Sequence, residues 1–232
     1  MIIAIIPARG GSKRIKNKNI KNFLSKPILY WALKALQKSN LFNRIIVSTD
    51  SLKIKKMCLK LGVDEIIDRP KDLSDDITPT KPVIEHAIKN MKFKDHKKVK
   101  FICCIYPCNP FLSPNDLKNS FKILKKNLKN FVFPVTEYPH PIQRAFKFKD
   151  DNKIVFFDRK NEFKRTQDLI KSFHDAGQFY WGTKNSWLSK KQMHSSSLGY
   201  IISKWRSVDI DNNEDWKKAE LLFKLLMNYG KI

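Results

Sequence analysis

The chain begins with a short apolar run, Ile2 to Ile6, that passes directly into a glycine-rich basic loop over residues 7–19. A buried β-branched strand followed at once by such a loop is typical of α/β proteins, and it constrains the fold more than any other feature. Glycines let backbone N–H groups approach phosphate oxygens, while Lys and Arg neutralise phosphate charge. The loop matches neither G-x-x-x-x-G-K-[ST] nor G-x-G-x-x-G, so it predicts an anion-binding turn of another kind.

Strand-like and helix-like segments alternate along the first two-thirds of the chain. Apolar runs predict strands over 2–6, 44–49, 64–67, 99–106 and 131–136, then over 178–181 and in a segment ending at Asp211. Helical periodicity predicts helices over 27–40, 52–61, 80–91, 114–128 and 214–229. This order predicts a largely parallel sheet covered on both faces. In such folds the site lies beyond the carboxyl ends of the strands, which selects the loops 7–22, 68–80 and 106–113.

The pattern changes after the strand over 131–136. Two short aromatic strands flank Asp150-Asp151-Asn152, which predicts a hairpin within an inserted arm over about 137–165. The aromatic residues of this hairpin either face a second subunit or cover the chain's own core, and the sequence favours neither reading: Phe146, Phe148, Phe156 and Phe157.

The chain carries 46 Lys and Arg against 22 Asp and Glu, a formal net charge of +24. Clustered cations would suit a nucleic-acid groove. Here the excess is mostly Lys spread over the whole chain, and the aromatics sit in apolar runs and not among basic clusters as a stacking platform needs. We therefore interpret the charge as a solvated surface and expect no nucleic-acid partner.

The four cysteines form no CxxC pair, so a structural zinc site is not indicated and we expect reduced, mostly buried thiols. No apolar run approaches the ~18–20 residues that span a bilayer, and the N-terminal run is too short for a signal peptide. These features predict a cytoplasmic protein with no membrane partner.

Two acidic residues, Asp209 and Asp211, lie two apart near the C-terminus. On a strand they would point to the same face. Two such carboxylates suit Mg²⁺, which prefers one or two carboxylates plus phosphates and waters. A charged edge strand before a helix explains the same spacing, so the residues alone leave both interpretations open.

His174-Asp175 invites a general-base interpretation. On a strand, however, neighbouring side chains point to opposite faces, so the two are not expected to form a dyad. The other histidines show no ligand spacing: His86 falls in a helical pattern, whereas His96, His140 and His194 fall in loops.

The segment Ile6-Pro-Ala-Arg-Gly-Gly-Ser-Lys-Arg-Ile-Lys-Asn-Lys-Asn19 resembles the opening of the CMP-sugar synthetases, or acylneuraminate cytidylyltransferases. These enzymes couple a nine-carbon α-keto acid sugar to CTP. The resemblance to this family continues through residues 45–50, 69–76 and 209–211. It implies a Rossmann-like nucleotidyltransferase fold, with one cytidylyltransferase domain over 1–232 and a homodimer formed through the arm.

Within this family, the segments 164–168 and 174–180 resemble the pseudaminic acid branch. Pseudaminic acid and CTP are therefore the expected substrates, giving a CMP-sugar and pyrophosphate. Legionaminic and N-acetylneuraminic acid are the alternatives. A related enzyme using another nucleotide, a catalytically silent relative and a basic nucleic-acid-binding protein without catalysis are further candidates.

The resemblance also implies roles for particular residues. The triphosphate would be held by Arg9, Gly11, Ser12 and Lys13, with Lys18 and Asn19 closing the loop over the reacting phosphate. The nucleotide pocket would be lined by Arg69, Asp76 and Thr80, and the sugar would meet Tyr106, Arg165, Gln167, His174 and Asp175. Asp209 and Asp211 would bind Mg²⁺, and catalysis would rest on Arg9, Lys13, Lys18, Asn19 and Asp211.

One loop departs from the family pattern. Many relatives have Gln-Pro-Thr-Ser-Pro-Leu-Arg after the central strand, whereas this chain has Tyr106-Pro-Cys-Asn-Pro-Phe-Leu112. Tyr106 stands where the Gln is expected and the Arg is missing, so the contacts of this loop stay open.

Overall fold

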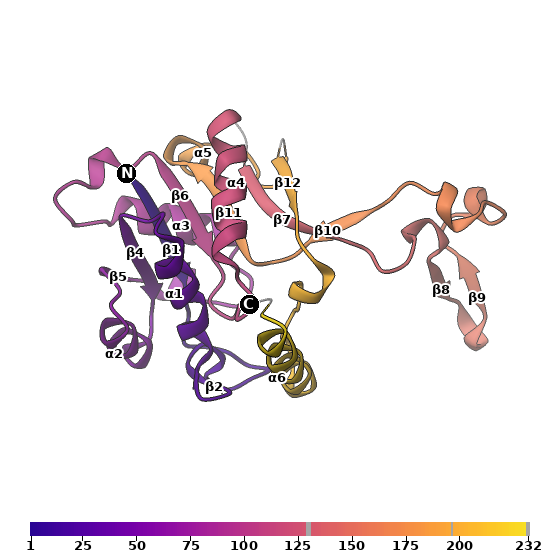
Figure 1. The fold of residues 1–232 in the computed structure, drawn as a ribbon, viewed down its shortest axis with the longest axis horizontal. Helices are drawn as coiled ribbons and strands as arrows, with labels where there is room; N and C mark the ends of the chain where they lie inside the picture. The colour runs from indigo at the N-terminus through magenta and orange to yellow at the C-terminus, as the bar shows by residue number, and fades with distance from the viewer. Residues whose placement is uncertain (129–130, 196, 231–232) are drawn as a thin grey trace.

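A mixed eight-stranded sheet forms the centre of the molecule (Figure 1). The computed structural model describes residues 1–128, 131–195 and 197–230. The strands run in the order β10-β7-β11-β6-β1-β4-β5, with β12 paired to β7. Their bounds are β1 (Ile2–Pro7), β4 (Arg44–Thr49), β5 (Glu65–Asp68), β6 (Phe101–Ile105), β7 (Phe131–Glu137), β10 (Phe173–Asp175), β11 (Phe179–Thr183) and β12 (Ser197–Ile201).

Alternating side chains of β1 supply both faces of the sheet. Ala4 and Ile6 pack against α1 (Ile28–Ser39), α2 (Leu52–Lys60) and α4 (Pro114–Lys126). Ile3 and Ile5 pack against α3 (Thr80–Lys89) and α5 (Lys184–Leu188). All four residues are fully buried, because a strand sandwiched between helices must be apolar on both sides. The predicted sheet covered on both faces is therefore confirmed.

The last helix, α6 (Asn213–Asn228), closes the underside of the first loop. Its Trp216 and Phe223 meet Phe23 edge-on at ring distances of 5.7 and 5.4 Å. Asn212 caps the helix and Asp215 accepts from the Asn212 backbone N–H, which is a capping box. The C-terminal part of the chain is thereby held beside residues 10–23.

The sheet is parallel through β6-β1-β4-β5, as the sequence predicts, but β10 and β11 run antiparallel to their neighbours. Two elements lack a clear sequence signal, the short helix α5 and the half-exposed strand β12. The strand predicted to end at Asp211 is wrong: residues 207–211 are irregular, because they run between a short 3-10 helix and α6 and pair with no neighbouring strand among the described residues.

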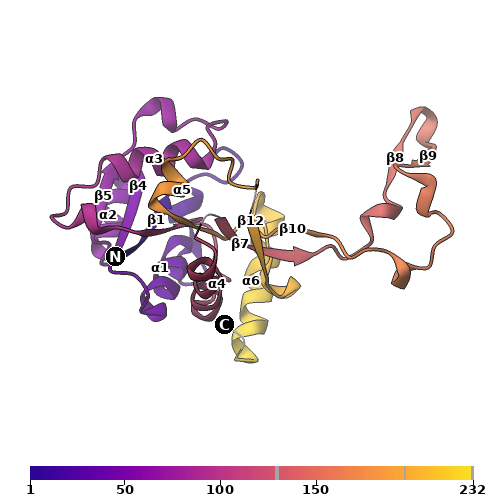
Figure 2. The same ribbon diagram turned by 90° about the horizontal axis from the view of Figure 1, so that it is seen from above.

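Residues 138–172, which we call the arm, leave the body after β7 and return at β10. Figures 1 and 2 both show the arm projecting well away from the sheet. It carries the predicted hairpin, β8 (Phe146–Phe148) with β9 (Ile154–Phe156), turned by Asp151 and Asn152 at φ 64° and 59°. Phe148 is 76% exposed. The alternative that the hairpin phenylalanines cover the chain's own core is therefore wrong for Phe146, Phe148 and Phe157.

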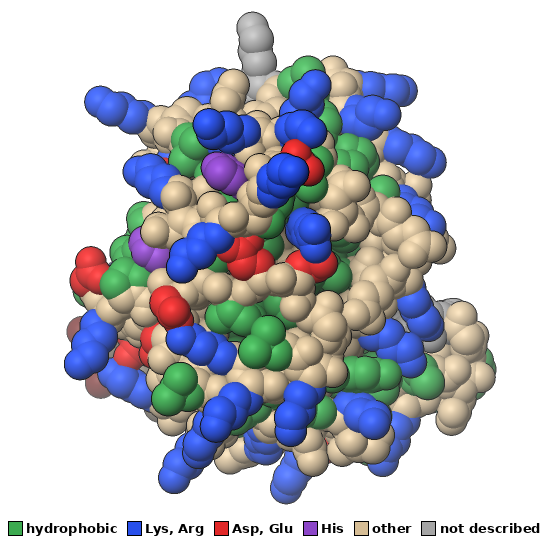
Figure 3. Space-filling view, turned by 90° about the vertical axis from the view of Figure 1, so that its left-hand side faces the viewer, with side chains coloured by type: hydrophobic (Ala, Val, Ile, Leu, Met, Phe, Trp, Pro, Cys, Tyr) green, Lys and Arg blue, Asp and Glu red, His purple; other side chains and the backbone are tan. Residues whose placement is uncertain are grey.

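Lysine and arginine are spread over the surface. Figure 3 shows them distributed across one whole face and not gathered into a single stripe. Among the described residues, the structure has no helix that is both long and apolar enough to cross a bilayer.

Candidate active site

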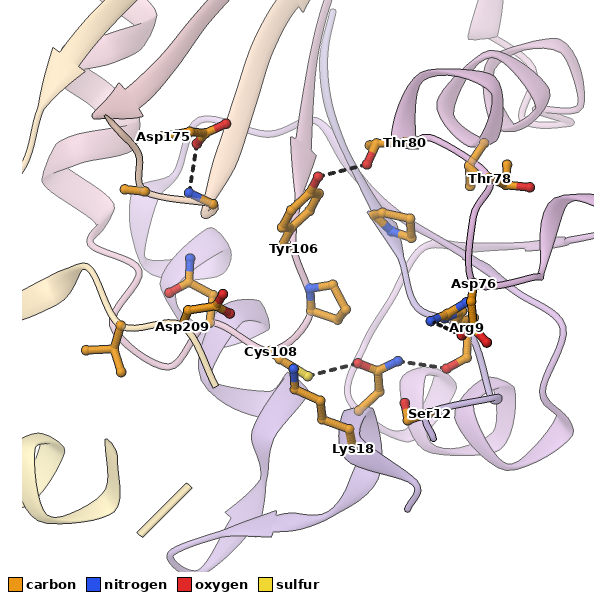
Figure 4. A pocket seen from close by; sticks show the side chains of 18 of the residues that line it. Arg9, Ser12, Lys18, Asp76, Thr78, Thr80, Tyr106, Cys108, Asp175 and Asp209 are labelled. Atoms are coloured by element: carbon orange, nitrogen blue, oxygen red, sulfur yellow. Dashed lines mark hydrogen bonds and ion pairs between the residues drawn. The ribbon is translucent and has the colours of Figure 1, made fainter. Parts of the chain in front are cut away.

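A cavity of about 590 Å³ opens at the carboxyl ends of β1, β5 and β6 (Figure 4). The loops after these strands meet there with residues 174–177 and 207–209. Of the residues expected from the sequence, the cavity is lined by Arg9, Ser12, Lys18, Asn19, Arg69, Asp76, Thr80, Tyr106, His174, Asp175 and Asp209. Gly11, Lys13, Asp211, Arg165 and Gln167 do not line it.

The first loop is held in place by close backbone approaches. The Gly10 N–H donates to Asp50 Oδ1 at 2.8 Å, and a Cβ on Gly10 would lie 2.9 Å from the Ser51 Cβ. Asn19, only 6% exposed, donates from Nδ2 to the Arg9 carbonyl at 2.7 Å and accepts from the Cys108 thiol at 3.0 Å. Asn19 therefore shapes the loop from inside.

A single carboxylate pairs with two cations of this loop. Arg9 Nη2 and Lys13 Nζ lie 2.7 and 2.5 Å from the two oxygens of Asp76. The hydrogen bond from Lys13, together with the charge of Arg9, lowers the pKa of Asp76. Asp76 thus balances the positive charge of both side chains.

Arg69 follows β5 and is 7% exposed, an uncommon environment for a guanidinium. It donates to the Ser48 carbonyl at 2.6 Å and to the Ser48 hydroxyl at 3.3 Å. Burial lowers its pKa to about 10, with Asp50 opposing that effect. Arg69 therefore remains charged at neutral pH and offers a fixed positive charge to the cavity.

Two tyrosines connect Thr80 with Asp175 across the cavity (Figure 4). Tyr106 and Thr80 share a hydrogen bond of 2.8 Å, and the rings of Tyr106 and Tyr180 lie 5.2 Å apart. Tyr180 donates to Asp175 Oδ2 at 2.8 Å, and His194 Nε2 lies 3.0 Å from the same oxygen. Asp175 therefore has a fixed orientation at the cavity wall.

His174 and Asp175 form no dyad, as the strand geometry predicts. His174 Nδ1 lies 2.9 Å from the Asp175 backbone carbonyl, not from its carboxylate. The imidazole that does contact the carboxylate is His194. Because His194 lies in a loop, no periodic pattern of the sequence indicated this contact.

The two C-terminal aspartates differ in their surroundings. Asp209 lines the cavity and, within the described part of the chain, pairs with no cation. Asp211 lies outside the cavity lining, 2.6 Å from Arg14 and 3.8 Å from Lys18. Ile210 between them is 2% exposed, which turns both carboxylates away from the core.

A buried ion pair holds the segment that carries Asp209. Arg206 pairs with Asp116 of α4, and Tyr200 donates to the other oxygen of Asp116 at 3.1 Å. Gln178, 2% exposed, donates to the Arg206 carbonyl at 2.5 Å. These contacts anchor the backbone immediately before residues 207–209.

Arg165 and Gln167 lie on the arm and outside this cavity. Arg165 pairs with Asp168 three residues later at 2.8 Å, and Gln167 is exposed. Within one chain, these two residues do not join the other residues expected to meet the sugar.

The loop 106–113 is expected from the sequence, but three of its residues that line the cavity had no expected role: Pro107, Cys108 and Asn109. Burial raises the pKa of the Cys108 thiol to about 12, with nearby Lys18 opposing and Asp209 reinforcing that effect. The thiol is therefore neutral and acts as a hydrogen-bond donor. The only available signal was the position of the loop after a buried strand.

Solved structures share this architecture. A CMP:2-keto-3-deoxy-manno-octonic acid synthetase complexed with CTP superposes with a TM-score of 0.68 over 97% of this chain and 98% of that one, at 12% identity. A 4-diphosphocytidyl-2C-methyl-D-erythritol synthase from Anaerococcus prevotii gives 0.60 over 96% and 98%, at 14% identity. At these identities the likeness shows the fold alone, and it is the nucleotidyltransferase fold.

Sequence comparison identifies the family. A family model described as cytidylyltransferase matches residues 3–225. The chain is 37% identical to a pseudaminic acid cytidylyltransferase of Campylobacter jejuni over 226 residues, 96% of each protein. It is 31% identical to an N-acylneuraminate cytidylyltransferase of Escherichia coli, covering 94% of this chain and 51% of that protein. The chain belongs to the cytidylyltransferase family.

Proposed function

We propose that this chain transfers the cytidylyl group of CTP to pseudaminic acid, giving CMP-pseudaminic acid and pyrophosphate. The observation that carries this proposal is the 37% identity over 96% of both chains to a pseudaminic acid cytidylyltransferase. A CMP-N,N'-diacetyllegionaminic acid synthase of Legionella pneumophila is 27% identical over 97% of both chains. Legionaminic and N-acylneuraminic acid are therefore the alternative acceptors.

The two sides of the cavity suit the two substrates. Figure 4 shows Arg9 and Ser12 on one side, Asp175 and Asp209 on the other, and Tyr106 and Cys108 between them. We assign the triphosphate to the side with the cations and the acceptor sugar to the side with the carboxylates, because phosphates bind cations and sugar hydroxyls donate to carboxylates.

In the proposed reaction the anomeric hydroxyl oxygen of the sugar bonds to the α-phosphorus of CTP. The bond from that phosphorus to the bridging oxygen breaks, and pyrophosphate leaves with the bonding electrons. The hydroxyl proton passes to solvent, since we assign no side chain as its acceptor. Arg9 and Arg69 position the triphosphate and stabilise the charge of the leaving group.

We also propose Mg²⁺ as the cofactor, with Asp209 as its first ligand. The Asp209 carboxylate lines the cavity and carries no ion pair within the described part of the chain, so it fits an ion that takes its other ligands from phosphates and waters. Asp211 can become a second ligand only after its carboxylate gives up the ion pair with Arg14. Bound Mg²⁺ supplies neutralisation of the phosphate oxygens.

The enzyme is proposed to act as a homodimer joined through the arm. Exposed apolar side chains gather there, including Phe163 at 95% and Ile170 at 83% exposure. Monomeric proteins seldom leave such groups in water. In a dimer the arm of one chain would carry Arg165 and Gln167 to the cavity of the other, where a guanidinium suits the sugar carboxylate. Because its four cysteines are free thiols, we place the enzyme in the cytoplasm.

Pyrophosphate release with CTP, Mg²⁺ and a panel of pseudaminic, legionaminic and neuraminic acids tests the proposal. We expect the highest kcat/KM with pseudaminic acid. Arg9→Met should lower the rate by about 10²–10³, the usual effect of removing one charged donor. Lys16→Met is the matched control, because Lys16 is an exposed cation of the same loop outside the cavity. Release with none of the acids would overturn the proposal, and a preference for another acid would overturn the choice of acceptor.

A further inference from the structure

Asn109 is a buried polar residue of the cavity wall, and the sequence assigns no role to it. It lies in the loop after β6, lines the cavity and is only 5% exposed. Its backbone carbonyl is used locally, accepting from the Leu112 N–H at 3.5 Å. The side-chain amide is therefore the part of Asn109 whose purpose needs explaining.

Among the described residues, the Asn109 Nδ2 is buried and has no hydrogen-bond partner. Asn19, the other buried amide of this cavity, uses both of its polar atoms within the protein. An unpaired buried donor costs folding free energy, and native structures seldom keep one without a functional reason. Asn19 thus has a structural role, whereas Asn109 presents a donor that the protein itself does not use.

The position of this donor points to one of the two substrates. The thiol of the preceding residue, Cys108, is close enough to Asp209 and Lys18 for their charges to act on it. Asn109 follows Cys108 directly and lines the same cavity, so we place its donor near residues 207–209. Figure 4 shows Arg9 and Ser12 on the opposite side of the cavity from Asp209. Asp175 offers acceptors for sugar hydroxyls on that side of the cavity, so an uncharged N–H donor complements it.

We propose that the Asn109 Nδ2 donates a hydrogen bond to an oxygen atom of the acceptor sugar acid and so makes Asn109 a specificity-determining residue. The proposal rests on the sugar-transfer function proposed above and adds a contact at the loop where Tyr106 replaces the family's glutamine. An oxygen acceptor on the sugar restores the hydrogen bond that the free protein lacks. An analogue without that oxygen leaves the donor buried and unpaired, which is a strong basis for rejecting it.

The test is Asn109→Leu, which keeps the branched shape of the side chain and removes the donor. We expect the KM for the sugar acid to rise at least tenfold, whereas the Kd for CTP, measured by calorimetry without sugar, stays within twofold. Asn127→Leu is the control for activity, because Asn127 lies at the surface end of α4 and bonds to Ile123. Asn109→Ser is the second variant if the leucine protein does not fold, with the same rise in KM expected.

Thermal unfolding separates this role from a structural one. Because the Asn109 donor is unpaired, Asn109→Leu should not lower the Tm, whereas Asn19→Leu should lower it by breaking two hydrogen bonds. A lower Tm with an unchanged KM, or an equal loss of CTP affinity, would overturn the proposal. Wild-type protein that binds CTP but uses no sugar acid would overturn the proposed function and this contact with it. Wild-type turnover with an unaffected Asn109→Leu variant would overturn this contact alone.

Discussion

Arg14 Nη1 lies 2.6 Å from Asp211 Oδ2, although the two residues are 197 positions apart in the sequence. Lys18 of the same loop approaches the other oxygen of Asp211 at 3.8 Å. The glycine-rich loop and the acidic C-terminal segment therefore meet in the folded chain. A site that needs both parts can form within one subunit.

This contact leads to a prediction about Asp211. Asp211→Ala should abolish turnover with the fold intact, because the proposed metal loses a ligand. Arg14→Met breaks the same ion pair from its exposed side, and surface pairs contribute only ~0–1 kcal/mol. We therefore expect Arg14→Met to retain the fold and most activity. Steady-state kinetics and circular dichroism measure both, and near wild-type turnover of Asp211→Ala would contradict the metal assignment.

Gly10 and Gly11 should respond differently to alanine. A Cβ on Gly10 would lie 2.9 Å from the Ser51 Cβ, whereas a Cβ on Gly11 meets nothing within 4 Å. Overpacking of this kind costs about 1–3 kcal/mol, so Gly10→Ala should lower the free energy of unfolding and weaken CTP binding. Gly11→Ala is the matched control. Urea unfolding that gives equal stabilities for the two variants would show that the close approach at Gly10 has no consequence.

The buried pair of Arg206 and Asp116 should dominate the stability of the C-terminal segment. Their side chains are 16% and 7% exposed, and removing one partner of a buried pair typically costs about 3–5 kcal/mol. We expect Arg206→Met to cause a loss of that order in chemical unfolding and to reduce turnover, since residues 207–209 follow directly. The double variant Arg206→Met with Asp116→Leu should recover much of the lost stability. A loss below about 1 kcal/mol in Arg206→Met alone would show that the ion pair does not anchor this segment.

Asp76 should compete with the triphosphate for Arg9 and Lys13. Asp76→Asn removes that competition, so we expect CTP and pyrophosphate to bind about twofold to fivefold more tightly at low salt, the range of an exposed ion pair. Since the pKa of Asp76 is lowered, the competing pair persists above the ordinary carboxyl pKa and is lost only as the pH falls through the lowered value. Calorimetry at two salt concentrations measures the effect, which should shrink as screening grows. Weaker binding by Asp76→Asn would show that Asp76 organises the two cations.

The arm should control the oligomeric state. Phe148→Ser with Phe163→Ser removes two aromatic side chains that are 76% and 95% exposed. If a second copy covers them, the variant should become monomeric by light scattering and lose turnover while its Tm stays close to wild type. Leu59→Ser on α2 is the control, an apolar residue 60% exposed on the body. A wild-type protein that is already monomeric would contradict the proposed dimer.

Much of the fold follows from local patterns. The buried run of β1, the cap at Ser51 and the positive φ of 77° at Gly62 match the strand, helix start and helix end that the sequence predicts. The carboxyl-end rule then placed Arg9, Arg69 and Tyr106 around one cavity. Periodicity reports whether a residue is buried, and it could not reveal that β11 runs antiparallel or that residues 207–211 form no strand.

The sequence by itself therefore determined the class of fold, the glycine-rich and cationic character of the first loop, and the loops that surround the cavity. Only the tertiary structure decided which side chains meet: Asp76 with two cations, His194 with Asp175, Arg14 with Asp211. It also decided which polar atom stays unpaired at Asn109. The physical reason is that strands and helices form from neighbouring residues, whereas hydrogen bonds across a cavity depend on how distant segments pack.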